Sequence, residues 1–268
     1  MKIGIIGYGS MGKMLLHKFV ENYKVTKDNL LVSSRTIEKL KEVSDVSTVL
    51  NNKEVAKQSD ILFLCIKPID YKVVLDEIKD FINKDAIVVS LNGSISFNTL
   101  NKLLDNKIVK VIPSLTAEID RSQTLVCFDS NITNNDKLVI KDLLSSFGSV
   151  IELPEDEMGM ASELVSCMPG FIASIFDCIS IEAKKHTTIK QEDIIKMLLN
   201  TLNATSSLML EKNMRFSDVV DRVATKGGIT KEGTNVIYEK FPNVCSELFI
   251  KTLEKRKETK ELIDNMFK

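Results

Sequence analysis

Three glycines, Gly7, Gly9 and Gly12, have a spacing that could do chemistry. They follow a short apolar run, Ile3 to Ile6, and precede an apolar helical pattern from Met11 to Phe19. In such a strand–turn–helix, the first glycine makes the tight turn, the second lets backbone approach a pyrophosphate, and the third lets the helix pack closely on the strand. The helix N-terminus also offers N–H groups to an anion. The spacing predicts a dinucleotide site, and the alternative is an ordinary tight turn that binds nothing.

Polar residues end the second predicted strand, Asn29–Ser34, where a dinucleotide-binding fold faces the adenosine ribose. NAD-selective sites usually have an acidic residue here, whereas this chain has Ser33, Ser34, Arg35 and Thr36. Hydroxyls and an arginine suit a 2′-phosphate, because the guanidinium binds phosphate through a planar fork. We therefore expect NADP(H) to be preferred over NAD(H), with Ser34 and Arg35 at the phosphate. The alternative is that Arg35 is a solvated surface residue.

A third group of candidate residues lies at 222–233, where the sequence is RVATKGGITKEG. Two adjacent glycines, Gly227 and Gly228, precede Thr230 at the predicted start of a helix that runs to Lys240. The N–H groups at a helix start suit a carboxylate or phosphate, and a hydroxyl at the cap is an orienting donor. Taken alone, these residues favour an anion site no more than a well-capped helix that binds nothing.

Alternating strands and helices must position the first two groups. The run Ser59–Lys67 is predicted to be a buried strand that Pro68 stops, and a helical pattern follows it. The next predicted strand, Ala86–Leu91, leads into the turn Asn92-Gly93-Ser94. Further strands are predicted at 108–112, 124–128 and 149–153. This alternation is typical of an α/β fold with a doubly wound, mostly parallel (Rossmann) sheet, whose ligand edge would carry Lys67, Pro68 and Asn92.

Helical periodicity dominates from Pro154 onward. Helices are predicted at 155–166 and 170–185, parted by Pro169-Gly170, and at 190–210, 216–222 and 244–267. The helix from Gly170 is apolar on most of its circumference, and the domain's length of about 115 residues is short for enclosing it. We therefore expect an NADP(H)-binding domain at 1–153, a helical substrate and dimerisation domain at 154–268, and a homodimer or higher homo-oligomer.

Composition limits the class of protein and its partners. With 36 basic and 37 acidic residues among 268, the net charge of −1 argues against a nucleic-acid partner. No apolar run approaches the roughly 18 residues needed to cross a membrane, and the start lacks the features of a signal peptide. Five cysteines without a C-x-x-C pair, and only two histidines, predict reduced thiols and no metal site. We expect a cytoplasmic protein with a small-molecule substrate.

Both predicted domains resemble the pyrroline-5-carboxylate reductase family. The motifs that carry the resemblance are KIGIIGYGSMG at the start, Cys65-Ile66-Lys67-Pro68, Val111-Ile112-Pro113, Met168-Pro169-Gly170-Phe171 and Lys226-Gly227-Gly228-Ile229-Thr230. The V-I-P-S and V-S-C-x-P sequences are most similar to the divergent late competence protein (ComER-like) branch of that family.

The resemblance implies an oxidoreductase of proline and amino-acid biosynthesis. Members of the family reduce 1-pyrroline-5-carboxylate, a cyclic imino acid, to proline with NADPH or NADH. By position, the resemblance implies a cofactor role for Gly7, Gly9, Ser10, Met11, Gly12, Lys67 and Pro68. It implies that Gly228, Ile229 and Thr230 hold the substrate carboxylate, with Thr230 next to the imine nitrogen and Met168 near the substrate ring.

Three turns depart from the family's pattern. Ser114 replaces an asparagine, Met168 replaces a glycine, and Ile229 replaces a small residue. The alternative function is therefore an NADP(H)-binding regulatory or competence-related protein that has lost reductase turnover. A β-hydroxyacid dehydrogenase is disfavoured, because it needs a lysine as acid–base group on the long helix after the sheet and Gly170–Ala183 has none.

Overall fold

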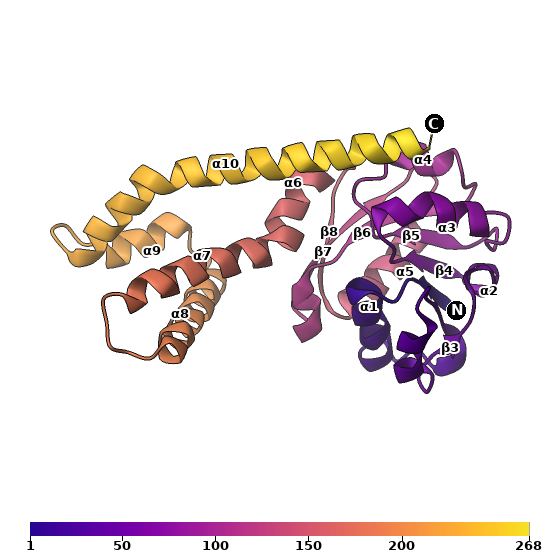
Figure 1. The fold of residues 1–268 in the computed structure, drawn as a ribbon, viewed down its shortest axis with the longest axis horizontal. Helices are drawn as coiled ribbons and strands as arrows, with labels where there is room; N and C mark the ends of the chain where they lie inside the picture. Colours follow the sequence, from indigo (N-terminus) through magenta and orange to yellow (C-terminus); the bar gives the residue numbers. More distant parts are fainter. Residues whose placement is uncertain (268) are drawn as a thin grey trace. The chain divides into compact units, whose positions relative to one another are not determined.

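The computed structural model describes residues 1–267, and within them eight strands form one sheet (Figure 1). The strands are β1 (Ile3–Ile6), β2 (Leu30–Ser33), β3 (Thr48–Val49), β4 (Ile61–Leu64), β5 (Ile87–Ser90), β6 (Lys107–Ile112), β7 (Ser122–Phe128) and β8 (Gly148–Glu152). Their order is β3-β2-β1-β4-β5-β6-β7-β8, and only the β6–β7 pairing is antiparallel among these described strands. The predicted mostly parallel, doubly wound sheet is confirmed.

Several strands end in register at one edge of the sheet. Ile6 pairs with Ser33 on one side and with Leu64 on the other. Leu64 pairs with Ser90, which in turn pairs with Lys110. The turns that follow β1, β2, β4 and β5 therefore lie side by side at the edge where parallel sheets of this kind bind ligands.

Helices cover both faces of the sheet, as the continuous apolar strands require. On one face, α1 (Ser10–Glu21) and α5 (Asn134–Ser145) share a core with the odd-numbered apolar residues of β1 and β4. On the other face, α2 (Asn52–Gln58), α3 (Tyr71–Ile78) and α4 (Phe97–Asn101) pack on the even-numbered ones. Short 3₁₀ helices connect these elements at η1 (Lys27–Asn29), η2 (Ile37–Val43), η3 (Pro68–Asp70) and η4 (Leu115–Ile119).

The predicted break between two helices at Pro169-Gly170 was wrong. Helix α6 (Met158–Ser162) continues through a π-helical segment, Glu163–Cys167, into α7 (Met168–Lys184). Proline normally interrupts a helix because its ring crowds the preceding turn and it lacks an N–H. Here the wider π turn comes directly before that ring, so the helix passes through Pro169.

The helices α8 (Gln191–Glu211) and α9 (Phe216–Val223) agree with prediction, but α10 does not. It runs as one helix from Ile229 to Met266, with Pro242 inside it, where two helices were predicted. A proline within good helix formers can be accommodated by a bend instead of an end.

Two compact units emerge from the contacts. One contains Met1–Pro169 together with the end of α10 from Leu253, and the other contains Gly170–Thr252. The last turns of α10 are anchored in the first unit, where Ile263 is fully buried in the core beneath α3 and α4.

The expectation that no apolar segment reaches membrane length was also wrong. The continuous helix Met158–Lys184 has a mean hydropathy of 1.8 over an 18-residue window and is long enough to cross a bilayer. Only 6% of that window is buried within the chain. Length and composition of this kind are shared by membrane spans and by helices that soluble proteins enclose, and one such helix is weak evidence for a span.

Candidate functional site

The glycines of the first turn meet three different surroundings. Gly7 has a φ of +101°, and a Cβ there would lie 2.5 Å from the Cys65 carbonyl oxygen. A Cβ on Gly12 would lie 2.0 Å from the Gly7 carbonyl oxygen. At Gly9, by contrast, no atom of the described chain lies within 4 Å of the Cβ position. The protein itself requires the outer two glycines, whereas Gly9 keeps open a space outside the protein.

That open space lies at the N-terminus of α1, which begins at Ser10. Gly9 is the N-cap residue, so it supplies no side-chain acceptor, and the first turn has no acidic residue. Ser10 is exposed, while Met11 packs against the core. A helix start left without a capping side chain is suited to bind an anion, because its N–H groups and the helix dipole both favour negative charge.

A hydrogen-bond network supports this turn, and the sequence patterns did not reveal it. Glu42, in η2, accepts hydrogen bonds from the Tyr8 hydroxyl at 2.9 Å and from Lys13 Nζ at 2.8 Å. The Lys13 bond, followed by that from Tyr8, lowers the pKa of Glu42. Burial, then the bond to Glu42, raises the pKa of Tyr8. The three residues connect the glycine turn to the segment after β2, and only their contacts in the fold identify them.

The turn after β2 carries an exposed arginine. The Ser33 hydroxyl is buried and donates to Asn52 at 2.7 Å, and Ser34 Oγ accepts from the Thr36 N–H at 3.2 Å. The Arg35 side chain is 86% exposed and lies 3.7 Å from the Asp70 carboxylate. Because exposed ion pairs contribute little, this guanidinium is available to an incoming phosphate.

The turns after β4 and β5 complete the edge. Lys67 is exposed and Pro68 begins η3, while burial raises the pKa of the neighbouring Cys65 thiol. Asn92 is buried; its Oδ1 accepts from the Ser94 N–H at 2.8 Å. Its Nδ2 has no hydrogen-bond partner among the described residues. A buried amide donor left unpaired is costly, so it marks a place where a missing group would be stabilising.

Ser114 and the π segment meet behind this edge. Ser114 Oγ donates to the Val165 carbonyl at 3.1 Å, which fastens the turn after β6 to the π segment. Within that segment Glu163 is 2% exposed, and its Oε1 accepts from Arg256 Nη2 at 2.7 Å. Burial raises the pKa of the Cys167 thiol in the same turn. Met168 follows, half-buried, as the first residue of α7.

The second glycine pair is in the other compact unit. Gly227 has a φ of +75° with no described atom within 4 Å of its Cβ position, and the Gly228 N–H donates to the Thr225 carbonyl at 2.9 Å. Helix α10 then begins at Ile229, which is 94% exposed. Thr230 is exposed and is the second residue of the helix, not its cap.

The structure thus brings the first two groups of candidates to one place. The strand ends bring Gly7, Gly9, Ser10, Met11, Gly12, Ser34, Arg35, Lys67, Pro68 and Asn92 to one edge of the sheet. Gly228, Ile229 and Thr230 lie at an exposed helix start in the other compact unit. The first arrangement can hold a dinucleotide, and the second can present N–H groups and a hydroxyl to a small anion.

Two family models match different parts of the chain. A family model described as pyrroline-5-carboxylate reductase dimerisation matches residues 155–259, and one described as NADP oxidoreductase, coenzyme F420-dependent, matches residues 2–93. The crystal structure of a Plasmodium falciparum pyrroline carboxylate reductase with NADP bound has a TM-score of 0.83, covers 100% of this chain and 98% of its own, and is 21% identical.

Curated relatives match almost the whole chain. Pyrroline-5-carboxylate reductase 3 of Bacillus subtilis is 31% identical over 95% of this chain and 95% of its own length. ComE operon protein 4 of the same organism is 26% identical over 100% of this chain and 99% of its own. The chain therefore belongs to the pyrroline-5-carboxylate reductase family and carries that family's dimerisation region.

Proposed function

We propose that the chain is an NADPH-dependent reductase of 1-pyrroline-5-carboxylate or a related cyclic imino acid, with proline as the product of the first. The observation that carries the proposal is the space beside Gly9, which opens at the uncapped start of α1 on the ligand edge of the sheet. The unpaired Asn92 Nδ2 on the same edge is a second sign of fit. When bound, NADPH supplies the hydride that reduces the imine carbon.

The roles in cofactor binding follow from the turns. Backbone at Gly7, Gly9 and Gly12, with the N–H groups of Ser10 and Met11, would hold the pyrophosphate. Ser34 and Arg35 would bind the 2′-phosphate, which favours NADP(H) over NAD(H). Lys67, Pro68 and Asn92 follow strands in the other half of the sheet and would hold the nicotinamide half.

The substrate would bind at the start of α10. The N–H groups of Ile229 and Thr230 would hold its carboxylate, Gly228 would leave backbone accessible, and the Thr230 hydroxyl would orient the imine nitrogen. Met168 would border the ring. A protonated imine is already an electrophile, so the residues mainly align the two reactants and little acid–base chemistry is required of them.

The domain division and the assembly are part of the proposal. Residues 1–153 would bind NADP(H), and residues 154–268 would bind substrate and dimerise. The match of 155–259 to a dimerisation model supports a homodimer or higher homo-oligomer, as do exposed apolar side chains on its helices: Ile181, Met197, Leu199, Leu210, Val236 and Val244. The protein would be cytoplasmic. For a homodimer or larger assembly, the native mass should be at least twice the chain's 30.1 kDa. A native mass of one chain would contradict it.

The test is a change at Thr230 with a matched control. Thr230→Ala should lower kcat/KM for 1-pyrroline-5-carboxylate by about 10- to 100-fold, the usual loss when one orienting hydrogen bond to a reacting group is removed. Thr230→Ser keeps the hydroxyl and should retain most of the activity. Loss of reduced-nicotinamide absorbance measures the rate, and unchanged activity in Thr230→Ala would contradict the assignment.

The alternative, a regulatory or competence-related protein without turnover, rests on Ser114, Met168 and Ile229, and on the full-length match to ComE operon protein 4. The same absorbance assay separates the two functions when it is run with NADPH and NADH over a panel of cyclic imino acids. Tight NADPH binding without oxidation by any member of the panel would favour the alternative.

A further inference from the structure

Lys110 is a buried lysine in the second half of β6, beside the last residue of β5. Along β6 it lies on the same face as Ile108 and Ile112, which belong to the apolar core under α3 and α4. Its side chain is only 2% exposed. A charge removed from water to this extent is costly unless it is paired and hydrogen-bonded, so the contacts of Lys110 must be compensating.

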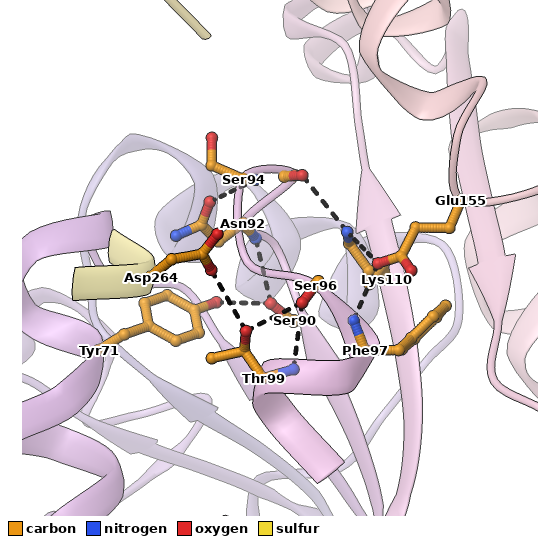
Figure 2. A network of polar contacts seen from close by, with 11 residues as sticks. Tyr71, Ser90, Asn92, Ser94, Ser96, Phe97, Thr99, Lys110, Glu155 and Asp264 are labelled. Carbon is orange, nitrogen blue, oxygen red and sulfur yellow. Dashed lines mark hydrogen bonds and ion pairs between the residues drawn. The ribbon is translucent and has the colours of Figure 1, made fainter. Parts of the chain in front are cut away.

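Two of these contacts reach separate segments at the ligand edge. Lys110 Nζ lies 2.9 Å from Glu155 Oε1 and donates to the Gly93 carbonyl oxygen at 3.3 Å (Figure 2). The same Glu155 oxygen accepts the N–H of Phe97, the first residue of α4, at 2.9 Å. The ammonium also lies 5.6 Å from the centre of the Phe97 ring. One ion pair thus joins β6, the start of α4 and the segment after β8.

Gly93 is held from more than one side. A Cβ at this position would lie 2.9 Å from Ile112 Cδ1 and 3.7 Å from Arg256 Nη1. Arg256 is itself fixed by its ion pair with the buried Glu163. The turn that begins at Asn92 is therefore contacted at two points: Lys110 binds the Gly93 carbonyl, and the side chains of Ile112 and Arg256 lie beside Gly93.

We propose that Lys110 is a positioning residue for the nicotinamide half of the cofactor. This inference rests on the proposed function. Dinucleotides lie across the two halves of such a sheet, and the glycine turn and Arg35 serve the adenosine half. The turn after β5 is in the other half. By holding the Gly93 carbonyl, Lys110 sets the backbone on which Asn92 presents its unpaired Nδ2.

The test compares two ligands that share the adenosine half. NADPH has both halves, whereas adenosine 2′,5′-bisphosphate lacks the nicotinamide. Lys110→Met should raise Kd for NADPH about tenfold or more, the equivalent of one charge-assisted hydrogen bond, and should change Kd for the bisphosphate less than about twofold. Lys110→Arg retains the charge and the donors and should restore most of the NADPH affinity.

Lys107→Met is the matched control. Lys107 is on the same strand and pairs with Asp136 at 2.7 Å, but it lies at the opposite end of β6 from the ligand edge. Its loss should alter neither Kd. If Lys110→Met does not fold, Glu155→Gln takes its place, because it removes the charge while keeping an acceptor for Phe97, and the same selective loss is expected.

Two results for Lys110→Met would overturn the inference. One is an equal loss of affinity for both ligands, which indicates general disruption of the site, and the other is no loss of affinity for either. Both Kd values are measured without turnover. A selective NADPH loss in a protein that never oxidises NADPH would support the role of Lys110 and reject the reductase. Normal turnover, combined with equal losses of affinity for both ligands, would support the reductase and reject the role of Lys110.

Discussion

The two glycine-marked turns differ in what determines their shape. In the first, a side chain on Gly7 or Gly12 would meet backbone oxygen at 2.5 or 2.0 Å, so the chain's own atoms leave no other choice of residue. In the second, Gly227 has no described neighbour within 4 Å, and the next exposed apolar side chain, Ile229, is 94% exposed. The first turn admits no side chain at either of these glycines, whereas in the second the space at Gly227 is open and a Cβ on Gly228 would lie 3.0 Å from the Thr225 carbonyl oxygen.

The largest effect is expected on protein stability at Gly12, and it tests most directly whether the two turns differ. Gly12→Ala should lower the free energy of unfolding by about 3 kcal/mol, because the added carbon must displace the Gly7 backbone. Denaturant unfolding measures the change. A variant as stable as the wild type would mean that the first turn yields as readily as the second.

The next effect should be on binding alone. In Gly9→Ala, the methyl group enters the space where no described atom lies within 4 Å, so the unfolding free energy should stay within about 0.5 kcal/mol. The Kd for NADPH should rise about a hundredfold, because the pyrophosphate needs that space. Fluorescence titration and thermal unfolding on the same sample test both parts, and an unchanged Kd would contradict the site.

A smaller, selective effect is expected from Arg35. Arg35→Ala should raise the Kd for NADPH about tenfold, because a charge-assisted contact is lost, and should leave the Kd for NADH unchanged. Arg35→Lys keeps the charge without the planar fork and should fall between the two. Equal losses for NADPH and NADH would assign Arg35 to a role other than the 2′-phosphate.

The smallest effect is predicted for the second turn. Gly227→Ala should cost roughly 1 kcal/mol of stability, because φ is +75° but no atom blocks the methyl group. Gly233, inside α10 and equally open, provides a control of opposite sign: Gly233→Ala should stabilise the helix by up to about 1 kcal/mol. A loss at Gly227 as large as that at Gly12 would remove the contrast between the turns.

The fold could be predicted wherever the signal was local. Apolar runs and the glycine spacing located β1, β4 and β5, and the change of pattern at Pro154 marked the end of the strands. Helix continuity through Pro169 and Pro242 could not be predicted, because local rules treat proline as an end and take no account of a preceding π turn.

The site was predicted as far as its glycines, hydroxyls and arginine. The charged residues that support its turns were missed. Glu42, Glu155 and Arg256 bind partners far away in the sequence, and in the sequence they resemble ordinary surface charges. The burial of Lys110 was missed as well, although the residue lies in the strand predicted at 108–112. Nothing in the spacing of a lysine indicates that its side chain is only 2% exposed, since that depends on which elements cover the strand.

The position of Tyr8 between Gly7 and Gly9 has an optical consequence. The chain has no tryptophan and only four tyrosines, so tyrosine dominates its ultraviolet emission. One of those rings is 5% exposed in the glycine turn and is hydrogen-bonded to Glu42. A dinucleotide arriving beside it should quench that emission, and Tyr8→Phe should remove the change. The molecule therefore contains its own spectroscopic reporter of cofactor binding, and no label has to be introduced.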